Sequence, residues 1–76
     1  MAEFRVYGVY ASCDSTNAWV FLHTGAAPVG WRKIEARSAD GCSNVLQVAA
    51  AAFVNGKDFV LCLLSEANEI RAISKN

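Results

Sequence analysis

Residues 41–56 read GCSNVLQVAAAAFVNG, a helix-length segment that contains no charged residue. Its alanines favour a helix, and a helical repeat of about 100° per residue gathers one broad apolar face, made of Cys42, Val45, Leu46, Ala49, Ala52 and Phe53. Ser43, Asn44 and Gln47 form a narrow polar stripe that Ala51 and Val54 continue. The segment predicts a mostly buried helix over residues 42–55, capped by Asp40 or Ser43 and ended by a left-handed Gly56.

Strand-like segments flank this helix on both sides. Aromatic and branched residues predict strands over residues 4–11, 18–24, 31–37, 58–64 and 69–74, with a loop at 25–30 around the single proline. Alternation in the first strand places Phe4, Val6, Gly8 and Tyr10 on one face and Arg5, Tyr7, Val9 and Ala11 on the other. The second strand is expected to run antiparallel to the first. Residues 58–64 are apolar on both faces, which predicts a central strand covered on both sides.

The resulting order, β-β-β-α-β-β, predicts a mainly β (α+β) fold in a single domain over residues 1–76. Five short strands with a helix between the third and fourth are typical of an OB-like Greek-key barrel, whose helix plugs one opening. A flat five-stranded sheet with a helix on one face is the alternative.

Composition indicates self-association. The chain of 76 residues is 54% hydrophobic and 18% charged, more apolar than so small a globule can readily bury. A homo-oligomer would cover the excess, and the helix positions Gln47, Ala51 and Val54 are the candidate interface. Seven basic and seven acidic residues leave no net charge, so capture of nucleic acid is not expected.

The sequence also bears on compartment. It starts MAEFRVYG, with no basic start followed by an apolar run, so it reads as cytoplasmic, or as secreted if a leader peptide has been removed. Three cysteines allow at most one internal disulfide. Its longest apolar run is too short for a membrane span, which needs about 20 residues.

Aromatic and basic residues mark the candidate ligand site. OB-folds hold ligands across strands 2 and 3, where this chain carries Trp19, Phe21, Trp31, Arg32 and Lys33. The polar loop that joins the first two strands adds Ser12, Asp14, Thr16 and Asn17, a composition able to bind sugar hydroxyls. Tryptophans that plug the barrel or lie at a subunit interface are the structural alternative.

Catalytic and metal-binding patterns are weak. His23 is the only histidine, and Cys42 would lie in the first helical turn, where a thiol can become nucleophilic, although it falls on the apolar face. Cys62 lies among leucines and is expected in the core. The spacing of these residues contains no metal-binding pair, so we expect no metal and no cofactor.

Four segments resemble a known family: TNAWVFLHTG, then GWRKIEA, then a helix running into VNGKDFVLCL, and a final EIRAI. Together they resemble small OB-like proteins related to the B subunits of bacterial AB5 toxins. The resemblance implies a ring-forming, non-catalytic subunit, of which a pentamer is one form, with helices facing a central pore and relatives that bind cell-surface glycans. A dimer is the fallback.

These observations predict a non-enzymatic, oligomeric binding protein whose ligand is a glycan or a protein partner. A single-stranded nucleic-acid-binding OB-fold is the first alternative, although the zero net charge counts against it. A small enzyme that uses Cys42 or His23 is the second.

Overall fold

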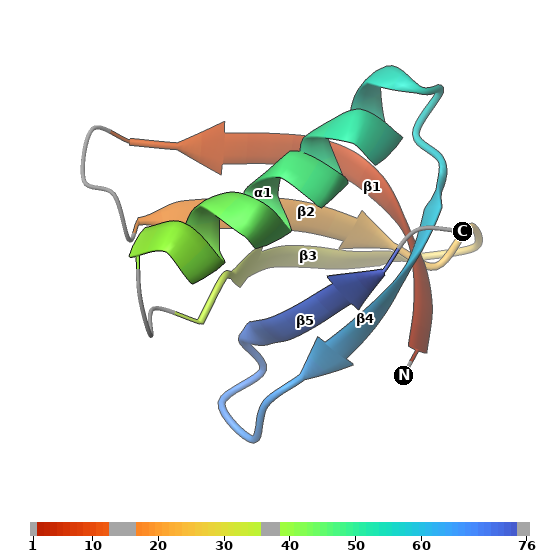
Figure 1. The fold of residues 1–76 in the computed structure, drawn as a ribbon. Helices are drawn as coiled ribbons and strands as arrows, with labels where there is room; N and C mark the ends of the chain where they lie inside the picture. The colour runs from red at the N-terminus through yellow and green to blue at the C-terminus, as the bar shows by residue number, and fades with distance from the viewer. Residues whose placement is uncertain (1, 13–16, 36–38, 75–76) are drawn as a thin grey trace.

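Within residues 2–12, 17–35 and 39–74, which a computed structural model of the chain describes, five strands accompany one helix (Figure 1). The elements are β1 (Ala2–Ala11), β2 (Ala18–His23), β3 (Pro28–Lys33), α1 (Ala39–Val54), β4 (Phe59–Leu64) and β5 (Ile70–Ser74). This confirms the predicted order and the mainly β class. No helix in the described part of the chain is long and apolar enough to cross a membrane.

The strands form one antiparallel sheet in the order β3-β2-β1-β4-β5. The two edge strands approach each other at one end, where Ile34 and Ile70 form an isolated parallel bridge and the Glu35 N–H donates to the Ile70 carbonyl at 2.9 Å. An ion pair from Arg71 Nε to Glu35 Oε2, 3.0 Å long, joins the same two segments. This short seam links β3 to β5.

A bulge in β1 changes the predicted alternation. The register with β2 shifts between Val6 and Gly8, so Tyr7 is the extra residue. Val6 is buried and Val9 packs against the core, although simple alternation would put them on opposite faces. The predicted faces are therefore correct up to Val6 and wrong beyond it, where Tyr10 lies on the exposed side.

The helix has the predicted phase. Cys42, Ala49 and Ala52 are buried, whereas Ser43, Asn44, Gln47, Ala51 and Val54 are exposed. It begins earlier than expected, at Ala39, so Asp40 and Ser43 lie inside it and neither is the predicted cap. Gly56 ends it with φ of 82°, as predicted, and Lys57 follows with φ of 59°. Two successive left-handed residues turn the chain back toward β4.

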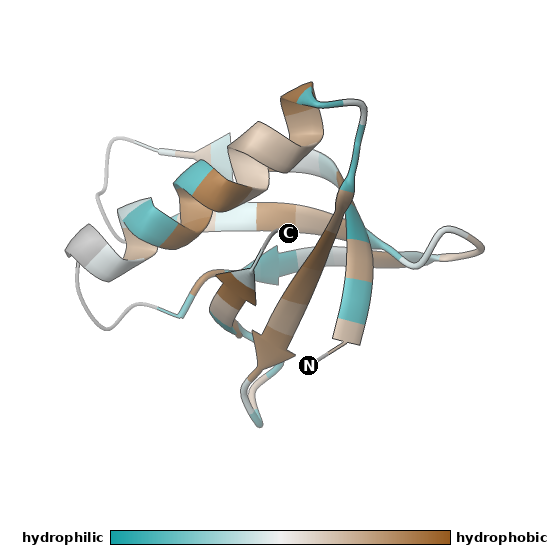
Figure 2. Cartoon of the chain, turned by 45° about the vertical axis from the view of Figure 1, so that its right-hand side comes forward, coloured by the Kyte–Doolittle hydropathy of each residue, from teal (hydrophilic) through white to brown (hydrophobic). Residues whose placement is uncertain are grey.

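Two strand predictions need correction. The loop predicted at 25–30 is shorter, because β3 already begins at Pro28; Pro28 belongs to an edge strand, where a missing N–H is tolerated. The strand also ends at Lys33, and residues 36–37 of the predicted strand lie outside the described residues. β4 is apolar along its length (Figure 2) but is covered on one face only, because Leu63 on the other face is exposed.

The core lies between the inward face of the sheet and the helix. The alanines of α1 allow the helix backbone to approach β1 and β2 closely, since Ala49 and Ala52 are fully buried. Small and branched side chains fill the remaining space; those that are buried on the sheet side are Phe4, Val6, Ala18, Val20, Leu22, Ile34, Val60, Cys62 and Ile70.

Replacing Leu22 by Ala should lower the free energy of unfolding by about 2–5 kcal/mol, because Leu22 is fully buried and its loss leaves a cavity. Urea denaturation measures the change. Val54→Ala is the control: Val54 is 81% exposed at the end of α1, so its replacement should change stability by less than about 0.5 kcal/mol. Similar losses in the two variants would contradict this placement of the core.

Candidate functional site

The outward face of β2 and β3 carries four of the predicted ligand residues. Trp19 lies opposite Lys33, and Phe21 lies opposite Trp31, in the antiparallel register of the two strands. Cross-strand partners share a face of the sheet, so these side chains form one surface. Inward residues Val20 and Leu22 alternate with them and anchor β2 in the core. This part of the predicted site is brought together as expected.

Trp31 is exposed but held in place. Its side chain is 46% exposed, yet its ring meets the ring of Phe21 edge-on, with centroids 5.4 Å apart and planes at 90°. The indole also lies over the backbone of Gly8, where a Cβ atom would stand 3.3 Å from Trp31 Cη2. The bulge that turns Gly8 outward therefore provides the space that the indole occupies. An ordered, exposed tryptophan is a typical recognition surface.

Trp19 is fixed by the polar loop between β1 and β2. Its Nε1–H donates to Asn17 Oδ1 at 2.9 Å, and Asn17 Nδ2 donates to Ser12 Oγ at 3.2 Å. The Ser12 N–H also donates to the Asn17 carbonyl. Ser12 and Asn17 thus position an aromatic ring. The predicted ligand residues Asp14 and Thr16 lie outside the described residues.

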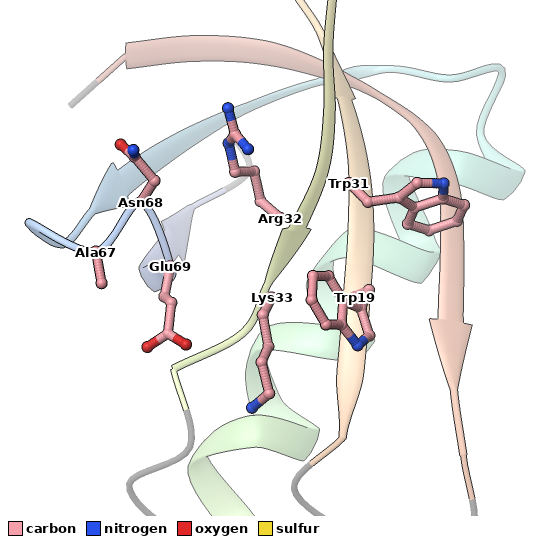
Figure 3. Close-up of a pocket in the computed structure, with 7 residues that line it drawn as sticks. All are labelled: Trp19, Trp31, Arg32, Lys33, Ala67, Asn68 and Glu69. Atoms are coloured by element: carbon pink, nitrogen blue, oxygen red, sulfur yellow. The ribbon is translucent and has the colours of Figure 1, made fainter.

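Arg32, predicted as a ligand residue beside Trp31 and Lys33, does not share their outward face. It lies opposite the fully buried Val20, so it projects toward the other side of the sheet. Figure 3 shows Trp19 and Trp31 on one side of β3 and Arg32 on the other, reaching toward the β4–β5 loop. Its Nε is buried and has no hydrogen-bond partner among the described residues. The edge position of β3 still lets Arg32 reach the same pocket as the tryptophans.

A pocket of about 250 Å³ extends over this edge. We call it the tryptophan pocket; it is lined by Trp19, Trp31, Arg32, Lys33, Ala67, Asn68 and Glu69. The last three residues come from the β4–β5 loop, where Asn68 is left-handed with φ of 59°. Glu69 was predicted as the first residue of the last strand, but β5 begins at Ile70. The loop residues Ala67, Asn68 and Glu69 lie near β3 because the seam joins β3 to β5. No local sequence pattern predicts that seam.

The charges around the tryptophan pocket nearly balance. Arg32 and Lys33 bring two positive charges and Glu69 one negative charge. A second cavity shares Ala67 and Glu69 with it, and its lining includes the charged residues Glu35, Glu66 and Arg71. The combined surface offers donors and acceptors beside aromatic rings, which suits an uncharged ligand rich in hydroxyl groups.

The side chains considered as catalytic candidates are buried or hydrogen-bonded within the fold. Cys42 and Cys62 are buried, 2% and 1% exposed. Burial raises the pKa of the Cys62 thiol from its ordinary 9.0 to about 11, because desolvation disfavours the thiolate. His23 Nδ1 accepts a hydrogen bond of 2.9 Å from the Gly25 N–H, and its ring stacks on Tyr7. Cys13 lies outside the described residues. In the described part of the chain, no three His, Cys, Asp or Glu side chains converge on a point that could hold a metal ion.

Comparisons with known proteins found no match, so the description of the site rests on its geometry. No protein-family model matches the chain, and no curated protein or solved structure matches it significantly.

The raised pKa of Cys62 predicts lower stability at alkaline pH. Below pH 9 the thiol is protonated in both the folded and the unfolded chain, so its contribution is constant. Between pH 9 and about 11 only the unfolded chain loses the proton, so unfolding releases a proton and rising pH favours it. Urea unfolding at pH 8, 9 and 10 should show this decline, and Cys62→Val should reduce it. An identical pH dependence in both proteins would contradict the burial of this thiol.

Proposed function

We propose that the chain is a non-enzymatic, OB-like binding module that holds a short glycan in the tryptophan pocket. The observation that carries this proposal is the pair of ordered indoles, Trp19 and Trp31, on the rim of a pocket with polar groups from a separate loop. Sugar rings stack their C–H faces on aromatic rings while their hydroxyl groups bond to surrounding polar side chains. OB-folds bind oligosaccharides at this place, between strands 2 and 3 and the last hairpin loop.

The OB-like part of the proposal rests on the seam. An OB-fold is a five-stranded Greek-key barrel that is only partly closed, so a short contact between its edge strands fits it. The Ile34–Ile70 bridge is parallel and joins the end of β3 to the start of β5. The sheet order and the position of the helix between β3 and β4 agree with the same barrel.

Charge favours a glycan over nucleic acid. Binding to a polyanion draws most of its affinity from neutralised phosphates, which requires an excess of positive charge. The chain has no net charge, and Glu69 lies in the pocket with Arg32 and Lys33. A hydroxyl-rich ligand needs both hydrogen-bond donors and acceptors, and its binding does not require an excess of positive charge.

A single-stranded nucleic acid is the second candidate, because the outward face carries more rings than the pocket uses. Tyr10 pairs with Trp19 on β2, and the Phe21–Trp31 pair follows. Bases of any sequence can stack on such a row. The two candidates differ in whether Tyr10, which lies outside the pocket, contributes to binding.

Self-association is part of the same proposal. The helix presents Ala51 and Val54 to solvent beside Gln47, and β4 presents Leu63. A second copy that covers α1 would remove Ala51 and Val54 from water and form a homo-oligomer, as a closed ring or as a dimer; Leu63 lies on the opposite face of the sheet and would need a separate contact. Several identical sites on one assembly would strengthen the binding of weak glycan ligands.

Trp31→Ala should weaken glycan binding by about tenfold or more, because it removes the exposed stacking surface. A glycan array identifies the ligand, and calorimetry with that glycan measures the loss. Tyr10→Ala is the matched control, since Tyr10 is 50% exposed on the same face but lies outside the pocket. No glycan binding, together with oligonucleotide binding at low salt that both variants weaken, would replace the glycan by the second candidate.

Ala51→Glu should dissociate the oligomer, because an unpaired carboxylate would be buried in the interface. Light scattering at micromolar concentration should give a multiple of the 8.2 kDa chain mass for the unmodified protein and a smaller mass for the variant. Ala26→Glu, at an exposed position in the β2–β3 turn, is the control and should leave the mass unchanged. A mass of one chain for the unmodified protein at all concentrations would refute self-association.

A further inference from the structure

A second group of aromatic and cationic side chains lies at the other end of the outward face. Arg5 on β1 lies between His23 at the end of β2 and Phe59 at the start of β4, and is the cross-strand partner of both. Tyr7 follows on β1, and Lys57 precedes β4. We call these five residues the cation–aromatic cluster. It shares no residue with the tryptophan pocket.

Aromatic rings hold both cations of the cluster. The Arg5 guanidinium carbon lies 4.6 Å from the centre of the Phe59 ring, and Lys57 Nζ lies 5.0 Å from the centre of the Tyr7 ring. Such contacts orient long, flexible side chains and leave their N–H groups able to donate. The two side chains have therefore already lost conformational entropy before a ligand binds, so binding orders them at a lower cost in free energy.

His23 adds an oriented hydrogen-bond donor. Because its Nδ1 accepts the Gly25 N–H, the ring proton of the neutral imidazole lies on Nε2. The ring is parallel to Tyr7, with centroids 4.3 Å apart and an angle of 3° between planes, so its direction is fixed. Arg5 is its neighbour on β1.

The positive charge of the cluster is not neutralised within the described part of the chain. Neither Arg5 nor Lys57 forms an ion pair there, and the buried Nε of Arg5 has no hydrogen-bond partner. Asp58 is the carboxylate nearest in sequence to Lys57, but its Oδ1 accepts the Phe59 N–H at 2.7 Å and its Oδ2 accepts Asn55 Nδ2 at 3.2 Å. Those bonds shape the turn into β4.

From this arrangement we infer that the cation–aromatic cluster is a binding site for an oxyanion, the phosphate or carboxylate group of a ligand. Arg5 and Lys57 supply charge-assisted hydrogen bonds, and His23 Nε2–H supplies a directed donor. The inference is independent of the glycan proposal, because it rests on different residues.

NMR titration of the unmodified protein with inorganic phosphate tests the inference, with sodium acetate as the carboxylate arm and sodium chloride at matched ionic strength as the control. We expect saturating shifts at Tyr7, His23 and Lys57 with phosphate, acetate or both, and none that saturate with chloride. Whichever anion binds more tightly identifies the source of the oxyanion group.

Arg5→Gln and Lys57→Gln should each weaken this binding by about tenfold, because each removes one charge-assisted contact. Lys33→Gln, in the tryptophan pocket, removes the same charge from the other end of the face and should leave the binding unchanged. If Arg5→Gln does not fold, Lys57→Gln decides the question, because Lys57 is exposed in a turn. Shifts that follow ionic strength alone, or equal weakening in all folded variants, would overturn the inference.

Discussion

The extra residue at Tyr7 in β1 is the constraint on which the rest of the structure depends. β1 is the central strand of the sheet and pairs with both β2 and β4. Inserting one residue lets Val6 and Val9 both face the core and turns Tyr7 and Gly8 outward. A bulge also bends its strand and increases the local twist. Without it, Val9 would face solvent and Tyr10 would enter the core.

The two candidate sites lie on opposite sides of this bulge. Gly8 leaves room for the Trp31 indole, which borders the tryptophan pocket, whereas Tyr7 carries the stack with His23 and the contact with Lys57. One irregularity therefore orders aromatic rings in two directions along the outward face. In each case a neighbouring side chain or backbone fixes the exposed ring, so that its orientation does not depend on a ligand.

Local patterns were sufficient to predict the elements. The uncharged run from Cys42 to Phe53 predicted the helix and its buried face, and aromatic and branched residues predicted the strands, because both depend on periodicity alone. Trp19, Phe21, Trp31 and Lys33 were grouped from the position at which OB-folds hold ligands, and the register of β2 with β3 brings them to one surface. The helix began three residues before the predicted start, since Asp40 and Ser43 resemble caps wherever they occur.

Features that depend on distant contacts could not be predicted. A bulge adds one residue without changing composition, so the faces of β1 after Val6 were assigned wrongly. Arg32 points to the face opposite Trp31, as adjacent strand residues do, and reaches the tryptophan pocket only because β3 is an edge strand. Asn68 and Glu69 joined the tryptophan pocket only because the seam brings β5 beside β3.

The position of β5 gives the fold a preferred direction of disassembly. The carboxyl-terminal strand lies at the edge of the sheet, paired with β4 along one side and tied to the β3 side by the Ile34–Ile70 bridge and the Glu35–Arg71 ion pair. It can detach without breaking any hydrogen bond between β1 and β2, whereas removal of β1 breaks the pairing with both β2 and β4 and leaves the two halves of the sheet joined only by the seam. A mechanical load on β5 is therefore borne first by an edge strand with one paired neighbour, and a load on β1 by the strand that is paired on both sides.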